Sequence, residues 1–429
     1  MTKLTKAEIA TILKNKNVFI WGARMTGLGA KRYLSANSVN VKGFIDSDPA
    51  FKNKTIQGLP VYSPEAFHNS SIKLSIDNLS IVIAVSLKES EIIKQYGGLF
   101  ENFSFYSFQN DNEPSYTVDI LGTCNLKCAS CPHSIEDHAV PKGSMSFDIF
   151  KNVFDKIMIE SPSTTHVSLY SWGEPLLHPH LDRIIDYVHD RNIAVALSSN
   201  LSINFKGRLE KIVKSNPDYL KISLSGYYQN TYANTHQGGD IELVKSNMLE
   251  LRKLMDKYNA NFLVDINYHL YIDNAGKNLD MMKKFAEELG FIISTTYALV
   301  MPLERVINYI NGKPDQTTLD LQKNMLVTID EGIEASSKTK LPEGECPFRE
   351  NQININADLT VPVCCTVFER NNLVTNNFLE TSFEEININK TKVKLCNECM
   401  KYNLPEYNMG FNKSRWKEIA EAKKITDET

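Results

Sequence analysis

The chain has 429 residues and a formal net charge of −4, from 47 Lys and Arg against 51 Asp and Glu. At roughly 150 residues per domain, this length predicts about two to four domains. Hydrophobic residues make up 42% and charged residues 23% of the chain, which excludes a disordered or fibrous protein. The mildly acidic charge argues against non-specific binding of nucleic acid, and there is neither a ~20-residue apolar run nor an apolar signal segment. We therefore expect a cytoplasmic protein that neither spans a membrane nor binds nucleic acid.

Residues 1–110 carry the pattern of a small α/β domain. Asn17–Trp21 is predicted to be a buried strand that runs into a glycine-bearing turn and a helix, and a second strand ends at Asp46. Backbone amides at such a turn, together with the helix N-terminus, can hold a phosphate. The glycines of the turn are Gly22, Gly27 and Gly29. Their spacing is G-x4-G-x-G rather than the dinucleotide pattern G-x-G-x-x-G, so a turn without a ligand is the alternative.

Two segments after this turn, Gly43-Phe-Ile-Asp-Ser-Asp48 and Gly58-Leu-Pro-Val-Tyr-Ser63, resemble the N-terminal domain of sugar-nucleotide acyltransferases and related sugar-modifying proteins. The resemblance implies that residues 1–110 form a Rossmann-like domain that binds a nucleotide or a nucleotide sugar. It places Asp46 where that family carries an acidic residue, which could face a ribose hydroxyl.

Strands and helices alternate from residue 115 to about residue 330, after a polar and aromatic linker at Phe100–Pro114. This alternation predicts a parallel sheet, open or closed into a partial barrel. The expected strands are residues 116–121, 167–170, 194–197, 219–224 and 262–268, and the expected helices include residues 147–158 and 181–190. The alternation stops at about Leu341.

All eight cysteines lie after residue 123, and most fall in tight groups. Cytosolic thiols are kept reduced, so such groups indicate metal or iron–sulfur ligands rather than disulfides. Cys124, Cys128 and Cys131 directly follow a predicted strand, and three thiolates on one short loop can hold three corners of a [4Fe–4S] cluster. The fourth iron would then be open to a substrate or cofactor. A zinc site with His133 as the fourth ligand is the alternative.

A C-x3-C-x2-C loop after the first strand of a repeated β/α unit resembles the radical S-adenosylmethionine (SAM) enzymes, and the likeness covers about residues 115–300. It implies a partial (β/α)6 barrel at residues 115–330, with a [4Fe–4S] cluster and SAM as cofactors. The residues that match the family's SAM-binding positions are Gly173, Glu174, Pro175, Ser199, Asn200, Ser223 and Ser225. Ser130 and Ser225 depart from the pattern, because the family often has an aromatic residue at the first position and an acidic residue at the second.

A second set of cysteines lies in residues 341–410, before a final helix at residues 411–429. Its members are Cys346, Cys364, Cys396 and Cys399, with Cys365 beside them. Four thiolates suit a zinc knuckle or a fully ligated [4Fe–4S] cluster. Beside a radical SAM core they resemble the shortened auxiliary-cluster extension known as SPASM or twitch. The resemblance implies a small iron–sulfur domain with one auxiliary [4Fe–4S] cluster, and a hairpin from Ile353 to Cys364 that turns at Ala357-Asp358.

The resemblance also implies an activity. One electron from the cluster cleaves SAM to a 5′-deoxyadenosyl radical, which abstracts hydrogen from a substrate C–H bond. We expect dehydrogenation or epimerisation of a carbohydrate or nucleotide-linked sugar, with a flavodoxin- or ferredoxin-type protein as electron donor. A maturase that modifies a peptide or protein is the second hypothesis. An iron–sulfur electron carrier or redox sensor is the third, although a carrier needs no SAM site.

One cysteine is left over, because the spacing in that family favours Cys364 over Cys365 as the cluster ligand. The Cys365 thiol could donate a hydrogen atom to a substrate radical, which would make the enzyme an epimerase. The alternative is a buried and inert side chain. The sequence does not identify a base, and the candidate bases are His178, His180, His236 and His269.

Overall fold

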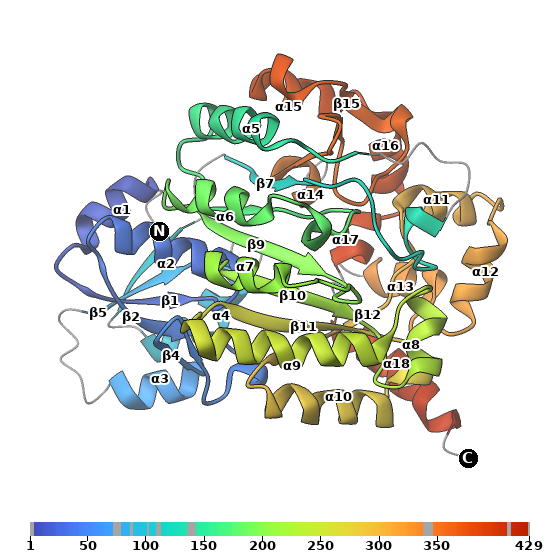
Figure 1. Cartoon of the computed structure of the whole chain (residues 1–429), viewed down its shortest axis with the longest axis horizontal. Coiled ribbons are helices and arrows are strands. Elements are labelled where there is room, and N and C mark those ends of the chain that lie inside the picture. Colours follow the sequence, from blue (N-terminus) through green and yellow to red (C-terminus); the bar gives the residue numbers. More distant parts are fainter. Residues whose placement is uncertain are drawn as a thin grey trace.

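The computed structural model describes residues 4–71, 79–85, 89–100, 103–108, 113–134, 143–337, 346–409 and 413–427. Two sheets dominate the chain: one in the N-terminal part and a larger one in the central part. In Figure 1 the N-terminal part, in blue, lies at the end where the central strands begin. The C-terminal segments, in orange and red, lie toward the end where those strands finish. No helix in the described ranges has the length and apolar character needed to cross a membrane.

The N-terminal sheet has six strands in the order β3-β4-β2-β1-β5-β6. Neighbouring strands are parallel except for the antiparallel pair β3 and β4. Its strands are β1 (Asn17–Trp21), β2 (Asn40–Ile45), β3 (Thr55–Ile56), β4 (Leu59–Tyr62), β5 (Leu79–Ile83) and β6 (Ser104–Ser107). Its helices are α1 (Lys6–Leu13), α2 (Met25–Ala36), α3 (Pro64–Ser71) and α4 (Glu89–Tyr96). The strand predicted at Asn17–Trp21 is confirmed, and four of its five residues are buried, as in a strand covered on both faces.

The linker predicted at Phe100–Pro114 is wrong for residues 104–107, which form β6 and pair with β5. Phe105 packs against the apolar cluster on one face of the sheet and Tyr106 against the cluster on the other. This short strand therefore covers the edge of β5, which a polar linker would leave open. Residues 101–102 and 109–112 of the predicted linker lie outside the described residues.

The central sheet has seven parallel strands in the order β12-β11-β10-β9-β8-β7-β13. They are β7 (Ser115–Val118), β8 (His166–Ser168), β9 (Ala194–Ser199), β10 (Tyr219–Leu224), β11 (Leu263–Leu270), β12 (Ile292–Tyr297) and β13 (Gln352–Ile355). Side chains alternate between the faces of such strands. Val167, Val195 and Ile222 belong to the large apolar core, whereas Thr117 and Ser168 line a cavity on the opposite face. The predicted parallel α/β sheet is confirmed.

The helices of the central part follow the strands and cover the apolar face of the sheet. They are α5 (Phe147–Glu160), α6 (Leu181–His189), α7 (Arg208–Ser215), α8 (Gln229–Thr235), α9 (Ile241–Tyr258) and α10 (Lys277–Glu288). Phe150, Ile184 and Met248 are each fully buried in this core. The helices predicted at residues 147–158 and 181–190 are confirmed, with ends shifted by one or two residues.

The C-terminal part adds one strand to the central sheet and forms a two-stranded sheet of its own. The hairpin predicted between Ile353 and Cys364 is wrong in its pairing, because β13 pairs with β7 of the central sheet, while β14 (Val361–Pro362) pairs with β15 (Leu373–Thr375). The turn predicted at Ala357-Asp358 is present, and there the Asn356 amide donates to the Thr360 carbonyl at 2.9 Å. The unpaired edge of β7 accounts for the difference, since it offers β13 a parallel ladder. The remaining helices are α11 (Leu303–Ile310), α12 (Gln316–Gln322), α13 (Ile329–Ser336), α14 (Pro347–Glu350), α15 (Phe383–Lys390), α16 (Lys394–Lys401), α17 (Leu404–Met409) and α18 (Lys413–Asp427). The predicted boundary at Leu341 lies outside the described residues.

The N-terminal sheet docks against the start of the central strands. Arg24 Nε lies 3.1 Å from Asp265 Oδ2, and Arg32 Nη2 lies 3.0 Å from Asp218 Oδ1. Asp218 is 2% exposed and also accepts hydrogen bonds from His189 and from the Val195 amide. Buried charges need such partners, so these carboxylates fix how the two parts meet.

A glycine lies at the closest approach of the two parts. A Cβ atom on Gly29 would lie 3.0 Å from the Thr165 carbonyl oxygen and 3.2 Å from the His166 Cβ. Helix α2 can therefore pack directly on the strands β8 and β9 because this position has no side chain. The apolar cluster of the N-terminal part continues into the central sheet through Tyr219 and Leu263.

The variant Gly29→Leu should be destabilised, although Leu is a better helix former than Gly. Forcing a side chain into this contact should lower the free energy of unfolding by about 1–3 kcal/mol, measured by urea denaturation. Gly98→Ala is the matched control, since nothing lies within 4 Å of a Cβ at that position. Unchanged stability of Gly29→Leu would contradict the close packing of α2 on the central sheet.

Candidate functional site

The first three cysteines lie on the loop after β7, and this loop is held by backbone bonds to the far side of the barrel. The amide of Lys127 donates to the Gln237 carbonyl at 3.0 Å, and that of Ala129 donates to the Thr235 carbonyl at 3.3 Å. The Ala129 carbonyl accepts from the buried Arg305 guanidinium at 3.0 Å. The loop therefore has a defined position at the carboxyl end of the sheet.

The three thiols are partly buried and lie close enough to affect one another's ionisation. Burial raises the pKa of Cys124 to about 11 and that of Cys131 to about 12, and it raises the pKa of Cys128 still further. Each of Cys128 and Cys131 also has its pKa raised by the neighbouring Cys124 thiol. Three thiolates would repel one another in this environment, and a bound cationic iron core would offset that electrostatic repulsion. The donor set fits a [4Fe–4S] cluster held by three cysteines.

Glu174 ties two neighbouring loops together at this edge of the sheet. Its side chain is 2% exposed and accepts from the Leu176 amide at 3.1 Å and from the Asn200 amide at 2.8 Å. Burial raises the pKa of Glu174 to about 7. The Asn200 side chain in turn donates toward the Cys124 sulfur over 3.6 Å. The sequence-predicted residues Glu174, Asn200 and Cys124 are thus brought into one network.

Asp119 is a residue of this network that the sequence analysis missed. It follows β7, is 2% exposed, and its carboxylate accepts from the amides of Trp172 and Gly173 at 3.2 and 3.3 Å. Burial raises the pKa of Asp119 to about 7. A Cβ on Gly173 would lie only 1.5 Å from the Leu121 carbonyl oxygen, so only glycine fits here. No local pattern marks Asp119, because it lies inside the strand predicted at residues 116–121 and its hydrogen-bond donors, the Trp172 and Gly173 amides, are more than 50 residues away in sequence.

The predicted serines have different environments. Ser199 Oγ accepts from the Leu201 amide at 2.9 Å, close to Glu174, and Ser223 is half-buried on β10. The Ser225 hydroxyl is fully buried and bonds to Thr235 and to His236 Nδ1. Ser225 therefore packs α8 against the sheet, while Pro175 begins the short helical turn Pro175–Leu177 beside Glu174.

The four candidate bases do not share one site. His178 bonds to the Met145 carbonyl at 2.8 Å, His180 is exposed, and His236 is stacked against Tyr232. His269 lines a cavity of about 570 Å3 beside Ser130, and burial lowers its pKa to about 4. Among the four, His269 is the one that lines a cavity described here.

The second cysteine group converges in the fold. Cys346, Cys364, Cys396 and Cys399 line one small cavity, although they come from α16 and from two separate parts of the preceding chain. Cys365 lines a different cavity on the side of the central sheet. This separation agrees with the prediction that Cys364, and not its neighbour, belongs to the four-thiol site.

Two basic side chains lie beside the four thiols. Arg349 lines the same cavity, and Lys390 donates to the carbonyls of Arg349 and Gln352 at 2.8 and 2.7 Å. Burial lowers the pKa of Lys390 to about 8. A four-iron cluster with four thiolate ligands carries net negative charge, so neighbouring cations fit such a group.

No three His, Cys, Asp or Glu side chains in the described ranges lie close enough together to hold a single metal ion. His133, the proposed fourth zinc ligand, has a buried Nε2 without a hydrogen-bond partner. A four-iron cube is larger than one ion and needs its thiolates further apart.

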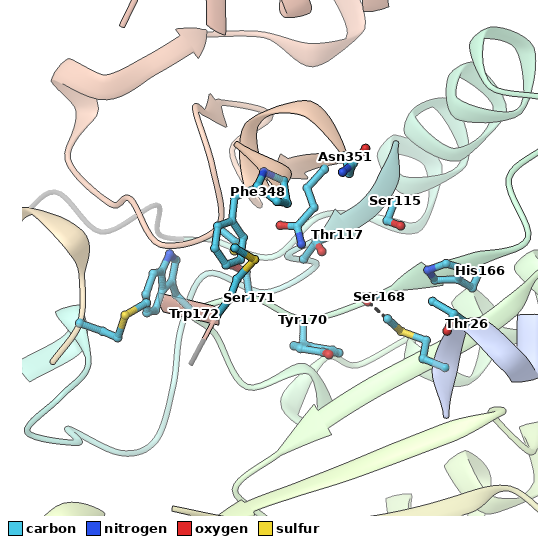
Figure 2. A pocket seen from close by; sticks show the side chains of 16 residues that line it. Thr26, Ser115, Thr117, His166, Ser168, Tyr170, Ser171, Trp172, Phe348 and Asn351 are labelled. Carbon is cyan, nitrogen blue, oxygen red and sulfur yellow. Dashed lines mark hydrogen bonds between the residues drawn. The ribbon is translucent and has the colours of Figure 1, made fainter. Parts of the chain in front are cut away.

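A cavity of about 460 Å3 lies on the face of the central sheet opposite its apolar core, and Figure 2 shows the side chains around it. It is bounded by residues of β7 and β8, by α2 of the N-terminal part, and by the C-terminal segment that carries Cys365. Trp172, next to the predicted SAM-binding Gly173, lies at one end, and His166 lies toward the other. Sequence analysis did not find this cavity, because its residues come from three separate parts of the chain.

The glycine turn of the N-terminal part faces the central sheet. Gly22 adopts a φ of +106°, and a Cβ on Gly27 would lie 1.8 Å from the Gly22 carbonyl oxygen. Asp46 accepts from the amides of Ala23 and Asp48 at 3.0 and 2.9 Å. These contacts, with that of Gly29, give the motif a role in folding and docking. Nucleotide binding at this turn stays a prediction.

Comparison with known families supports the assignment of the central part. The family model described as "Radical SAM superfamily" matches residues 118–270, which contain the three-cysteine loop and the predicted SAM-binding residues. Members of this superfamily use a [4Fe–4S] cluster and SAM, so the match confirms the predicted radical SAM core and its two cofactors.

Two curated proteins show partial sequence similarity. The AdoMet-dependent heme synthase of Methanosarcina barkeri is 27% identical over 187 residues, 42% of this chain and 49% of that protein. The antilisterial bacteriocin subtilosin biosynthesis protein AlbA of Bacillus subtilis is 31% identical over 94 residues, 22% of this chain and 20% of that protein. The chain thus spans about half of the first relative and a fifth of the second.

Solved structures align with part of this chain. anSMEcpe with bound AdoMet aligns with 73% of this chain and 95% of its own, at 15% identity and a TM-score of 0.46. BtrN in complex with AdoMet and 2-DOIA aligns with 68% of this chain and 88% of its own, at 14% identity and a TM-score of 0.37.

Iron content tests both cysteine groups. The anaerobically reconstituted protein should bind about eight irons per chain, and replacing Cys124, Cys128 and Cys131 together by Ala should leave about four. Cys364→Ala should likewise lose about four irons, whereas the adjacent control Cys365→Ala should lose none. Metal analysis measures the iron content of each variant, and electron paramagnetic resonance detects the clusters that remain. Stoichiometric zinc without iron would contradict the assignment, as would equal iron loss in the Cys364 and Cys365 variants.

Proposed function

We propose that the protein is a radical SAM enzyme that dehydrogenates or epimerises a carbohydrate, free or linked to a nucleotide. The observation that carries this proposal is the chemistry of the 460 Å3 cavity on the face of the central sheet opposite its apolar core. None of the described residues that line it is Asp, Glu, Lys or Arg. Its polar lining residues include Thr26, Ser115, Thr117, Ser168, Ser171, Asn351 and Gln352. Hydroxyl and amide groups of this kind suit the hydroxyls of a sugar ring.

Aromatic side chains complete this lining. Tyr170, Trp172 and Phe348 face the same space, as Figure 2 shows. Aromatic surfaces pack well against the C–H faces of a sugar, while a few placed polar groups fix its orientation. The volume of about 460 Å3 lies in the ordinary range for small-molecule sites.

The cavity lies between the two cysteine groups in the fold. At one side, Trp172 precedes Gly173 and Glu174, which belong to the network around Cys124. At the other side, Cys365 adjoins Cys364 of the four-thiol site, which we propose binds an auxiliary [4Fe–4S] cluster. A substrate in the cavity would therefore lie near both redox centres.

When bound, SAM and its cluster supply a 5′-deoxyadenosyl radical that abstracts a hydrogen atom from a C–H bond. The protein's own residues position the reactants. Cys124, Cys128 and Cys131 hold the cluster, and Asp119 and Glu174 fix the loops that adjoin SAM. The side chains that line the cavity would orient one carbon of the substrate. A flavodoxin- or ferredoxin-type protein is the proposed electron donor.

Modification of a peptide is the second candidate function. It is favoured by the similarity to a protein named for the biosynthesis of subtilosin, over 94 residues. A peptide backbone with charged side chains would need complementary groups in the site. The uncharged lining of the cavity therefore favours a carbohydrate over a peptide as the substrate.

SAM cleavage in the presence of deuterated substrates tests the proposal. Reduced protein should form 5′-deoxyadenosine, and a C-deuterated nucleotide sugar that is a substrate should transfer deuterium into it. The variant lacking Cys124, Cys128 and Cys131 should form none. Absence of 5′-deoxyadenosine from a protein that holds both clusters would contradict radical SAM activity, and deuterium transfer from a peptide alone would favour the maturase.

Cys365→Ala distinguishes epimerisation from dehydrogenation. Burial raises the pKa of Cys365 to about 12, so the side chain is a thiol that can give a hydrogen atom to a carbon radical. The sulfur radical left behind would return to a thiol by taking up one electron and one proton. In an epimerase the variant should keep SAM cleavage and both clusters but lose at least ~90% of the product, measured by mass spectrometry. Product formation at the wild-type rate would make Cys365 a packing residue.

A further inference from the structure

His166 has a feature that the proposed chemistry does not explain. It begins β8, is 5% exposed and lines the 460 Å3 cavity. Its Nδ1 lies 3.4 Å from Thr165 Oγ1, whereas its Nε2 has no hydrogen-bond partner in the described part of the chain. Buried polar atoms are nearly always paired, so an unpaired one in a cavity wall points to a ligand.

The charge state of the ring restricts that ligand. Burial and the nearby Lys6 ammonium lower the pKa of His166 to about 4, so the ring is neutral near pH 7. A neutral imidazole has one N–H donor and one acceptor nitrogen. A hydroxyl group can complement either nitrogen, because it both donates and accepts. A phosphate or carboxylate would meet no positive charge among the described residues that line this cavity.

The N-terminal part supplies the wall next to His166. The Cβ atom of His166 packs against Gly29 of α2, and Met25 Sδ accepts from the Ser168 hydroxyl at 3.2 Å. Thr26, in the first turn of the same helix, also lines the cavity beside His166, as Figure 2 shows. Amides in a first helical turn have no acceptor within the helix and can pair with a ligand. The helix therefore closes the floor of the cavity.

We propose that His166 and Thr26 together bind a hydroxyl of an uncharged sugar ring, so that the N-terminal part completes the substrate site. The inference rests on the proposed function and narrows its substrate to a ring that enters with its hydroxyls toward α2. The nucleotide of a nucleotide sugar would remain outside this cavity, since its phosphates are charged.

Isothermal titration calorimetry of the full-length reconstituted protein with SAM tests the assignment. The probes are UDP-glucose, UDP-N-acetylglucosamine and GDP-mannose, each compared with UDP or GDP alone. At least one sugar conjugate should bind more tightly than its nucleotide. His166→Phe, which keeps an aromatic ring but removes both nitrogens, should weaken binding of that conjugate about 5- to 10-fold, the value of one hydrogen bond, and leave binding of the nucleotide unchanged.

Three further variants keep the test decisive. His166→Asn should restore part of the affinity, and Thr26→Val, which keeps the shape and removes the hydroxyl, should weaken the sugar conjugate as well. His180→Phe, at an exposed histidine outside the cavity, should change nothing. The assignment is overturned if wild-type protein does not distinguish the conjugates from the nucleotides, or if neither His166→Phe nor Thr26→Val alters the difference. If the wild-type protein does not cleave SAM but still binds the sugar in a His166-dependent way, the proposed function is contradicted while the assignment of His166 holds.

Discussion

Two buried carboxylates, Asp119 and Glu174, hold together the loops at the carboxyl edge of the central sheet. Loops that leave a parallel sheet carry amides without ladder partners, and buried amides must be paired. Asp119 accepts from Trp172 and Gly173, and Glu174 accepts from the Asn200 amide. The position of the first cysteine loop depends on these bonds, because the Asn200 side chain reaches the Cys124 sulfur. A side chain without an acceptor, such as alanine, at either acidic position would leave buried amides unpaired and would free the loops that adjoin the proposed cofactor site.

Buried carboxylates paired with donors also join the N-terminal part to the central sheet. Asp218 is surrounded by the donors of Arg32, His189 and Val195, and Asp265 pairs with Arg24. These carboxylates lie near the starts of the central strands, at the opposite edge from Glu174. One edge of the sheet thus binds a structural partner and the other carries the proposed cofactor site. The glycine turn, which resembles a phosphate-binding motif, serves packing in this arrangement, as Gly29 lies directly against Thr165.

Local patterns in the sequence predicted β1, β2, the central strands β7 to β11 and both cysteine groups, because apolar runs and thiol spacing act over short distances. Asn17–Trp21 and Tyr219–Leu224 have the same bounds in the prediction and in the structure. Strands β6 and β12 were missed, and β13 was expected in a hairpin rather than beside β7. Strands β6 and β13 are short, and each depends on an open edge supplied by a distant strand. Asp119 and His166 were missed for a related reason. A single polar residue beside an apolar run has no sequence signature, and only its tertiary neighbours give it a role.

The neighbours Cys364 and Cys365 show how the fold could couple electron transfer to the substrate. The two residues lie in a bend and turn that follow β14. Cys364 lines the four-thiol cavity, while Cys365 lines the proposed sugar cavity. In the proposed function, a cluster held by the Cys364 group would accept the electron that a substrate radical loses, together with a proton, on becoming a ketone. The Cys365 thiol would instead donate the hydrogen atom of an epimerisation, so the position of the substrate carbon relative to this sulfur would favour one of the two proposed reactions.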